Sequence, residues 1–452
     1  MTKLSIGDEF SQLFQLAIPL IGAQLAQSII GFIDTIMMGR LGADTLAAGG
    51  LASLTFNSFL LTIAGIVMSL SPLIAEAYGA KNHQRITKLT YQGLWLVVLL
   101  AIPSMVLVAK LDIVMLLLGQ TPTTVNLANS YLDVILWGFF PALGFAMLRC
   151  VMSALSQTRP IMMIVAVGTV LNIFGNYVLG FGKLGFPNLG LAGLALASAL
   201  THWVMFFALL FCSLKHPQLK KYGLFQKIQS LNLPTITELL KVGVPIAVFY
   251  SLEVGLFVTV TYLMGVLGTE VLAAHQIVLQ TIYVVFMIPL GISLATTIRV
   301  GQWLGKRNMI GIKLSAYLGL ASGLAFAVVI TIVMLLFPQA VVGLYLDLNN
   351  PTNAPIVALA LPMLTVGTLA QALDGMQKIA YGALQGLQDT KIPMLLSIPA
   401  FYGVGLTTGC ILSFSFNWGG VGLWLGQSVG LAVGAVLFLI RFRQLIRHQK
   451  CW

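Results

Sequence analysis

The stretch VPIAVFYSLEVGLFVTVTYLMGVL (residues 244–267) is apolar apart from a few hydroxyl groups and one carboxylate, Glu253. As a helix, it is long enough to cross about 30 Å of hydrocarbon. A carboxylate at bilayer depth is costly unless it faces a cavity or a partner. Asp34 and Asp374 lie in comparable apolar stretches. Together, the three carboxylates indicate a cation or proton pathway through a membrane protein.

The composition places the whole chain in the same class. Hydrophobic residues make up 58% of the 452 residues and charged residues only 8%, whereas soluble domains carry about 25% charged residues. The long apolar runs favour helices over the short alternating strands of a barrel. We predict an all-α integral membrane protein with twelve transmembrane helices, near 14–38, 46–70, 88–109, 125–150, 160–181, 189–214, 238–264, 272–298, 314–337, 355–382, 393–414 and 419–442.

The net charge of +11 is distributed as an orientation signal. When the gaps between segments are numbered in order, 21 of the 24 Lys and Arg residues fall on one side, and only Arg40, Lys110 and Lys183 fall on the other. The positive-inside rule then predicts that both termini are cytoplasmic. We therefore expect a lipid bilayer around the chain and no nucleic-acid partner. The first apolar run is too long for a cleavable signal peptide.

The second half of the chain repeats the first. FSQLFQLAIPLIGAQLAQ (10–27) aligns with ITELLKVGVPIAVFYSLE (236–253), and the same shift of 226 aligns Leu46-Ala47-Ala48 with Leu272-Ala273-Ala274. A constant register of this length indicates a duplication. Two parallel repeats of six helices are typical of alternating-access transporters. We predict an N-terminal six-helix lobe (1–214), a cytoplasmic linker (215–237) and a pseudo-symmetric C-terminal six-helix lobe (238–452).

Polar side chains share faces of several predicted helices. In the first segment, Gln27 and Asp34 follow Gln24 by three and ten residues, and all three lie on one helical face. We expect Glu253, Asp374 and Asp34 to carry the coupling cation. In addition to Gln24 and Gln27, the expected cavity-lining residues are His275, Gln276, Gln280, Tyr283, Phe286, Met287, Gln371 and Lys378.

The carboxylates allow two kinds of coupling, and each residue also has a structural alternative. Hard cations prefer oxygen ligands, so Glu253 and Asp374 are candidate Na⁺ ligands; a buried carboxyl group can also exchange protons near neutral pH. Asp374 could instead form a permanent pair with Lys378, four residues later. Neighbouring amides and hydroxyls could satisfy Asp34, and His275 is either a proton relay or a hydrogen-bonded structural residue.

Several longer segments resemble the multidrug and toxic compound extrusion (MATE) family, in particular its NorM-like bacterial branch. They are FIDTIMMGRLGADTLAA (32–48), SPLIAEAYGAKN (71–82), LAAHQI (272–277), VFMIPLGISLATTIRVGQWLG (285–305) and the region from ALDGMQ (372–377) to GALQGLQDTKIPM (382–394). The resemblance covers nearly the whole chain and implies a V-shaped, cation-coupled drug antiporter built from two six-helix lobes.

The resemblance also implies roles for individual residues. Asp34, Glu253 and Asp374 match the acidic residues of the family's first, seventh and tenth helices, and Phe286 matches an eighth-helix aromatic that is often tyrosine. Lys378 departs from the pattern, because an apolar residue is expected there. This lysine would compete with Na⁺ at Asp374, whereas we expect Glu253 to be unaffected.

The leading hypothesis is a secondary active multidrug efflux antiporter of a bacterial inner membrane. It would export organic cations and other drugs in exchange for Na⁺ or H⁺, act as a monomer and need no cofactor. We expect no enzyme activity, because we see neither a nucleophile–base constellation nor a phosphate-binding loop. A flippase for a lipid-linked precursor is the alternative and would favour a strongly cationic cavity. A channel or a purely structural membrane protein is a third class.

Overall fold

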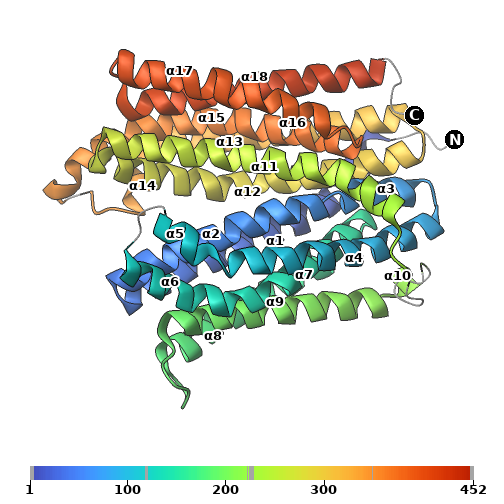
Figure 1. Cartoon of the computed structure of the whole chain (residues 1–452). Helices are drawn as coiled ribbons and strands as arrows, with labels where there is room; N and C mark the ends of the chain where they lie inside the picture. The colour runs from blue at the N-terminus through green and yellow to red at the C-terminus, as the bar shows by residue number, and fades with distance from the viewer. Residues whose placement is uncertain (1–4, 118–120, 221, 223–228, 349, 448–452) are drawn as a thin grey trace. The chain divides into compact units, whose positions relative to one another are not determined.

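The computed structural model describes residues 5–117, 121–220, 222, 229–348 and 350–447, and these residues are helical apart from short connections (Figure 1). Within this part of the chain, twelve helices are long and apolar enough to cross a membrane. The prediction of an all-α protein with twelve spans is therefore confirmed.

The helices follow one another along the chain with few interruptions. The first half contains α1 (Ile6–Leu41), α2 (Ala43–Val67), α3 (Leu70–Gly79), α4 (His83–Val108), α5 (Leu111–Leu117), α6 (Pro122–Ile135), η1 (Leu136–Gly138), α7 (Phe139–Ala154), α8 (Arg159–Gly175), η2 (Asn176–Gly180), α9 (Gly190–Lys215) and α10 (Pro217–Lys220). The second half contains α11 (Leu233–Leu267), α12 (Thr269–Gly305), α13 (Met309–Leu336), α14 (Pro338–Gly343), η3 (Pro351–Asn353), α15 (Ala354–Gly386), α16 (Lys391–Ile398), η4 (Pro399–Leu406), α17 (Thr407–Cys410), η5 (Ile411–Ser415) and α18 (Gly419–Arg447).

Most of these helices extend beyond the apolar segments predicted from the sequence. Helix α12 runs from Thr269 to Gly305, whereas hydropathy predicts 272–298. The additional turns carry polar residues such as Arg299 and Gln302, which continue the helical backbone without adding apolar character. Hydropathy therefore detects the apolar part of each helix and not its ends.

The local backbone repeats between the two halves. Gly42 and Gly268, which the shift of 226 aligns, have φ values of 134° and 133° at the start of α2 and α12. The side chains of Asn82 and Asn308, aligned by the same shift, accept backbone N–H bonds at the start of α4 and α13. Such caps satisfy donors that the first helical turn leaves unpaired. The two halves therefore resemble each other in the backbone conformation of single helical turns as well as in sequence.

The chain divides into two compact units. We call Gly22–Ala247 the N unit, and Met1–Ile21 together with Val248–Trp452 the C unit. One boundary falls inside α1, after Ile21, and the other inside α11, after Ala247, and the shift of 226 relates these two positions as well. Of the predicted linker 215–237, residues 221 and 223–228 lie outside the described residues.

Within the C unit, small residues and interhelical hydrogen bonds hold α15 against α12. Helices α12, α13, α15 and α18 lie side by side (Figure 1). Ser293 Oγ of α12 donates to the Lys378 carbonyl at 2.7 Å, and Thr297 Oγ1 donates to the Gly382 carbonyl at 2.9 Å. Such bonds, with glycine allowing close approach, are typical of helix association in membranes. They fix the part of α15 that carries Lys378.

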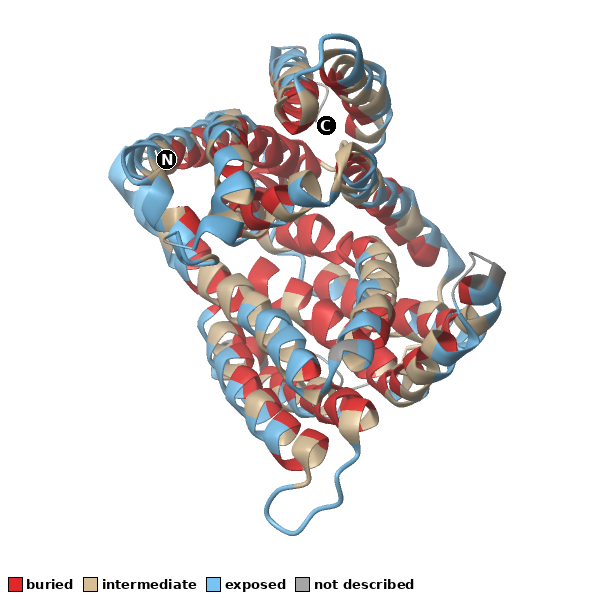
Figure 2. Cartoon of the chain, turned by 90° about the vertical axis from the view of Figure 1, so that its left-hand side faces the viewer, coloured by how far each residue is buried: buried red, intermediate tan, exposed pale blue. Residues whose placement is uncertain are grey.

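Within the N unit, α9 packs closely on the segment that follows α8. A Cβ atom added at Gly193 of α9 would lie 2.6 Å from the carbonyl carbon of Leu179, so only glycine fits this approach. Buried and exposed residues lie on different faces of the same helices (Figure 2). Exposed apolar residues such as Ile102 and Val106 suit contact with lipid.

Candidate functional site

A buried ion pair lies in the C unit, between α15 and α11. Lys378 Nζ donates to Glu253 Oε2, and the two side chains are only 1% and 9% exposed. Lysine is rarely buried to this degree unless it is paired. The pair therefore satisfies a charged group on each helix at a depth where either charge alone would be expensive.

Aromatic rings surround the Lys378 ammonium. Its nitrogen lies 4.2 Å from the ring centroid of Tyr250, 5.1 Å from that of Phe249 and 5.7 Å from that of Phe286. Phe249 in turn stacks on Tyr381 with the ring centroids 3.8 Å apart. Cation–π contacts of this kind contribute about 0.5–2 kcal/mol each, with the larger values where the cation is desolvated. The surroundings of Lys378 are therefore suited to hold a positive charge.

Two further polar residues of α15 are buried without completing their hydrogen bonds. Asp374 and Gln371 are buried, and within the described part of the chain Asp374 Oδ1 and both amide atoms of Gln371 lack hydrogen-bond partners. Glu253 Oε1 is also without a partner among these residues. Buried polar atoms without partners are uncommon and often mark functional positions.

The structure corrects the expectation that Glu253 is unaffected by Lys378. The lysine forms its ion pair with Glu253 of the neighbouring helix, and no Lys378–Asp374 ion pair occurs among the described residues. The sequence suggested Asp374 because it lies four residues away on the same helix. The long, flexible lysine stem reaches across to α11 instead, which only the packing of α15 against α11 determines.

The remaining candidates of the C unit lie on α12. His275 is fully buried, its Nε2 lies 2.9 Å from Thr261 Oγ1, and its ring centroid is 5.5 Å from that of Trp424. This environment matches the structural alternative for His275. Met287 is also buried, Gln280 and Phe286 are half-buried, and Gln276 and Tyr283 are exposed. Of the α12 candidates, Phe286 is the one that contacts the ammonium.

In the N unit, neutral side chains hold the carboxylate of Asp34. Asn176 Nδ2 donates to Asp34 Oδ1 at 2.5 Å, and Ser198 Oγ lies 3.4 Å from Oδ2. Asn172 Nδ2 in turn donates to Ser198 Oγ at 3.0 Å. Asn176 begins the π-helical turn η2, a distortion that often occurs at functional sites. The sequence signal for this cluster is the pair Asn172 and Asn176, one turn apart in an apolar run.

Gln24 and Gln27 of α1 contact an arginine that the sequence analysis assigned to the cytoplasmic charges. Arg149 Nη1 of α7 donates to Gln24 Oε1 at 3.1 Å and to Gln27 Oε1 at 3.4 Å. Arg149 is half-buried, and it forms no ion pair with a described carboxylate. The three predicted residues of the N unit thus divide into two places, with Asp34 in one and both glutamines in the other.

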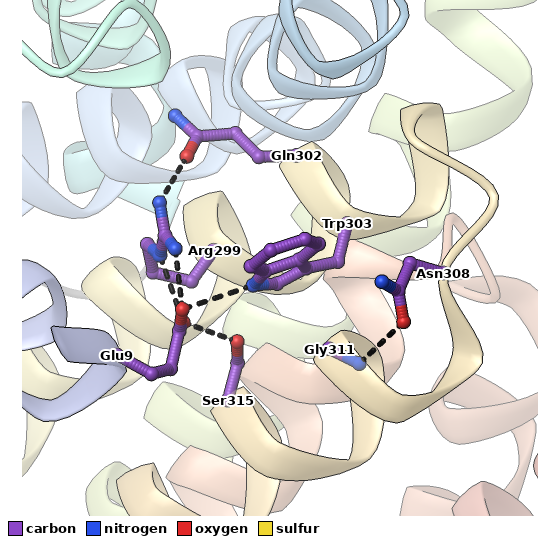
Figure 3. A network of polar contacts seen from close by, with 7 residues as sticks. All are labelled: Glu9, Arg299, Gln302, Trp303, Asn308, Gly311 and Ser315. Atoms are coloured by element: carbon purple, nitrogen blue, oxygen red, sulfur yellow. Dashed lines mark hydrogen bonds and ion pairs between the residues drawn. The ribbon is translucent and has the colours of Figure 1, made fainter. Parts of the chain in front are cut away.

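A second buried ion pair of the C unit was not expected from the sequence (Figure 3). Arg299 of α12 donates through Nε and Nη2 to the Glu9 carboxylate of α1, at 2.9 and 2.5 Å. Trp303 Nε1 and Ser315 Oγ donate to the same carboxylate at 3.1 and 2.5 Å. Bidentate geometry and extra donors compensate a buried carboxylate well. Glu9 lies outside the apolar segment predicted for α1, so hydropathy did not single it out.

The comparisons with known proteins agree with this architecture. The MatE family model matches residues 19–178 and 245–411, which together make up more than half of the chain. The chain belongs to the MatE family. The resemblance seen in the sequence is therefore confirmed, and the two matched ranges start at positions that the shift of 226 relates.

Curated relatives within the MatE family align along nearly their whole length. The "Probable multidrug resistance protein NorM" of Synechococcus sp. is 49% identical over 449 residues, which cover 99% of this chain and 97% of that protein. The "Multidrug resistance protein NorM" of Burkholderia vietnamiensis is 37% identical and covers 95% and 92%. The chain is thus a multi-pass membrane protein of a family whose members are transporters rather than enzymes.

Solved structures of the same family share the fold at low sequence identity. A mutant of the Vibrio cholerae MATE transporter VcmN superposes with a TM-score of 0.90 at 17% identity and covers 99% of both chains. The eukaryotic MATE transporter AtDTX14 gives a TM-score of 0.87 at 21% identity, covering 99% of this chain and 100% of that one. The likeness supports the twelve-helix architecture independently of the sequence alignment.

Proposed function

We propose that this protein is a secondary active exporter that moves drugs, mainly organic cations, out of a bacterial cell in exchange for an inward cation, H⁺ or Na⁺. The observation that supports this most directly is the group of acidic side chains inside apolar helices: Glu253 and Asp374 in the C unit and Asp34 in the N unit. The membrane potential supplies about 2.3 kcal/mol per charge per 100 mV, enough for modest uphill export.

Two features of the chain suit alternating access. Its halves repeat each other in sequence and in single turns of backbone, as in transporters built from two parallel repeats. We propose lobes at 1–214 and 238–452, joined by the cytoplasmic linker 215–237. The 21 to 3 distribution of Lys and Arg supports an inner-membrane orientation with both termini cytoplasmic. The working unit is proposed to be a monomer.

The residue roles follow from their surroundings. Glu253 and Asp374 are proposed to exchange the coupling cation, and Asp34 to respond to it in the N unit. Gln371, Phe286 and Met287 are proposed to line the path of the drug beside the Glu253–Lys378 pair, together with Gln276, Gln280 and Tyr283 on α12. Within the N unit, Gln24 and Gln27 on α1 are proposed to contact the drug. His275 is proposed to keep the structural role that its contacts indicate. A flippase is disfavoured, because the buried Lys378 is neutralised by Glu253 rather than available to a pyrophosphate.

Transport in sealed vesicles tests the proposal. The full chain is reconstituted, a fluorescent organic cation is added, and Na⁺ and pH gradients are imposed separately. Movement of the dye against its own gradient is expected with at least one of the two, and dissipating that gradient should stop it. If neither gradient moves the dye in vesicles that contain correctly folded protein, the exporter proposal fails.

A further inference from the structure

The Lys378 ammonium is bound inside the protein and does not lie on its surface. Its ammonium contacts the Glu253 carboxylate and faces Tyr250, Phe249 and Phe286. A carboxylate combined with aromatic faces is the arrangement that binds organic ammonium ions. The position that a cationic drug, or Na⁺ at the carboxylate, is expected to take is thus already held by the protein's own ammonium group.

The position of this cation is fixed by the backbone of α15. Ser293 Oγ donates to the carbonyl of Lys378 itself, and Thr297 Oγ1 to that of Gly382, one turn later. The start of the lysine stem therefore cannot shift without breaking bonds to α12. The four-carbon stem can still rotate, so the ammonium moves while its helix stays in place.

Asp374 offers the ammonium a second partner. It lies one helical turn before Lys378 and is buried, and its Oδ1 has no hydrogen-bond partner among the described residues. Side chains four residues apart on a helix are close enough to pair. The charged and titratable groups around the ammonium are therefore Glu253 and Tyr250 on α11 and Asp374 and Tyr381 on α15, while α12 contributes the uncharged Phe286.

The Lys378 ammonium and a Na⁺ ion would compete for the same two carboxylates. A Na⁺ ion that took Glu253 would release the ammonium to Asp374, and one that took Asp374 would lie beside an ammonium held by Glu253. In neither case does Na⁺ have both carboxylates, and a lysine left buried without a partner is costly.

We propose that Lys378 acts as a tethered cation that occupies the Glu253–Asp374 pair in place of Na⁺, and that it moves from Glu253 to Asp374 when a cationic drug binds Glu253. The proposal rests on the proposed export function and deepens it. It assigns Lys378 as the residue that selects the coupling ion. With Na⁺ excluded from this pair, the inward cation of the exchange is the proton, which Asp374 carries while Glu253 holds the ammonium and releases when the ammonium moves to Asp374.

Sodium binding to the purified full chain tests the proposal without transport. The protein in detergent is titrated with NaCl against KCl at constant total salt, while its melting temperature and its binding of radioactive Na⁺ are followed. The wild-type protein is expected to show no Na⁺-specific response. Lys378→Met should gain a saturable one, with a rise of about 2 °C at a Na⁺ concentration about ten times Kd.

Three further variants separate charge from packing. Lys378→Arg keeps the cation and should remain as insensitive to Na⁺ as the wild type. Lys378→Gln, which keeps a hydrogen-bond donor, should gain the response even if the methionine variant folds poorly. The double variant Lys378→Met/Glu253→Gln should lose the gain, because the carboxylate that Na⁺ would bind is gone.

Two outcomes would overturn the proposal. One is saturable Na⁺ binding by the wild-type protein that Glu253→Gln removes. The other is a folded Lys378→Met or Lys378→Gln variant that gains no Na⁺ binding. Either result would leave the exporter proposal intact, since that proposal stands or falls on dye movement in vesicles. Conversely, vesicles that fail to move any dye would not alter the binding result.

Discussion

The N unit and the C unit share a backbone pattern but differ in how they treat buried charge. The shift of 226 aligns Glu253 of the C unit with Gln27 of the N unit. Glu253 pairs with a buried lysine, whereas Gln27 offers a neutral oxygen to the half-buried Arg149. The carboxylate of the N unit, Asp34, is held by an amide and a hydroxyl. Duplication thus preserved the scaffold while the two halves acquired different electrostatics.

The difference suggests a division of labour. A carboxylate matched by an ammonium can exchange one cation for another, because its charge is already compensated in the resting state. A carboxylate held by neutral donors keeps its own charge uncompensated and responds to any cation or proton that reaches it. The predictions below test whether the C unit carries the exchange and the N unit only supports it.

The largest effect is expected from Glu253→Gln. Export of an organic cation should fall to background, because the variant removes the carboxylate that exchanges cations and leaves the Lys378 ammonium without its partner. Dye transport in sealed vesicles, normalised to the amount of protein in the membrane, measures the effect. At the aligned position, Gln27→Ala removes no charge and leaves Arg149 its second acceptor, Gln24, so this variant should retain much of the export.

A control separates loss of exchange from loss of stability. The double variant Glu253→Gln/Lys378→Met replaces the ion pair with uncharged side chains, which is often neutral for stability. Its melting temperature should therefore return toward the wild-type value while export stays at background. Recovery of export in this double variant would contradict a coupling role for Glu253.

The next largest effect is a loss of stability, expected when the buried Glu9–Arg299 pair of the C unit is broken. The more exposed Glu238–Arg85 pair of the N unit serves as the comparison. Glu238 and Arg85 are 40% and 37% exposed and lie 2.8 Å apart, whereas Glu9 and Arg299 are 2% and 6% exposed. Glu9→Ala should lower the free energy of unfolding by about 3–5 kcal/mol, because it strands a buried guanidinium. Glu238→Ala should cost less than about 1 kcal/mol. Chemical unfolding in detergent measures both, and equal losses would refute the distinction.

The sequence alone predicted the helices better than the contacts of their polar residues. Apolar runs of membrane length determine where helices form, and the repeat of Gly42 at Gly268 or of Asn82 at Asn308 is visible as identity at a fixed shift. The partner of Lys378, in contrast, depends on which face of α15 meets α11. A search for ion-pair partners four residues away on the same helix finds only Asp374. Partners on different helices have no fixed spacing in sequence, so such a search misses Glu253.

The same limit applies to residues at the ends of apolar runs. Arg149 and Arg299 were counted as cytoplasmic charges, because a positive-inside analysis assigns each cation to a side and not to a contact. Glu9 lies before the apolar part of α1, so its burial depends on α12 and α13 packing around it. Such contacts follow from tertiary packing, which the spacing of residues along one helix does not describe.

A smaller effect is expected from Asp34→Asn. The variant keeps an oxygen that accepts from Asn176 but removes the negative charge, and charge-assisted hydrogen bonds contribute about 1.5–3 kcal/mol. Export should fall about tenfold, the equivalent of about 1.4 kcal/mol, and thus less than in Glu253→Gln. Initial rates of dye transport at several dye concentrations provide the measurement. A loss as complete as that of Glu253→Gln would assign the two units equal roles.

The smallest effect is expected from replacing the aligned glycines Gly42 and Gly268, and it tests the backbone conformation that the two units share. Gly42 and Gly268 adopt φ values of 134° and 133°, where a side chain is strained whatever space surrounds it, and an added Cβ would meet only Thr45 Oγ1 at 4.0 Å in the first case and nothing within 4 Å in the second. Gly42→Ala and Gly268→Ala should therefore each cost about 1 kcal/mol of stability from backbone strain alone.

Chemical unfolding of both variants in detergent gives the comparison. Gly50→Ala is the helical control, because its Cβ meets no atom within 4 Å. Equal losses at the two positions are expected because the strain belongs to the repeated backbone. A large loss at only one of them would mean that the two halves differ in scaffold as well as in charge.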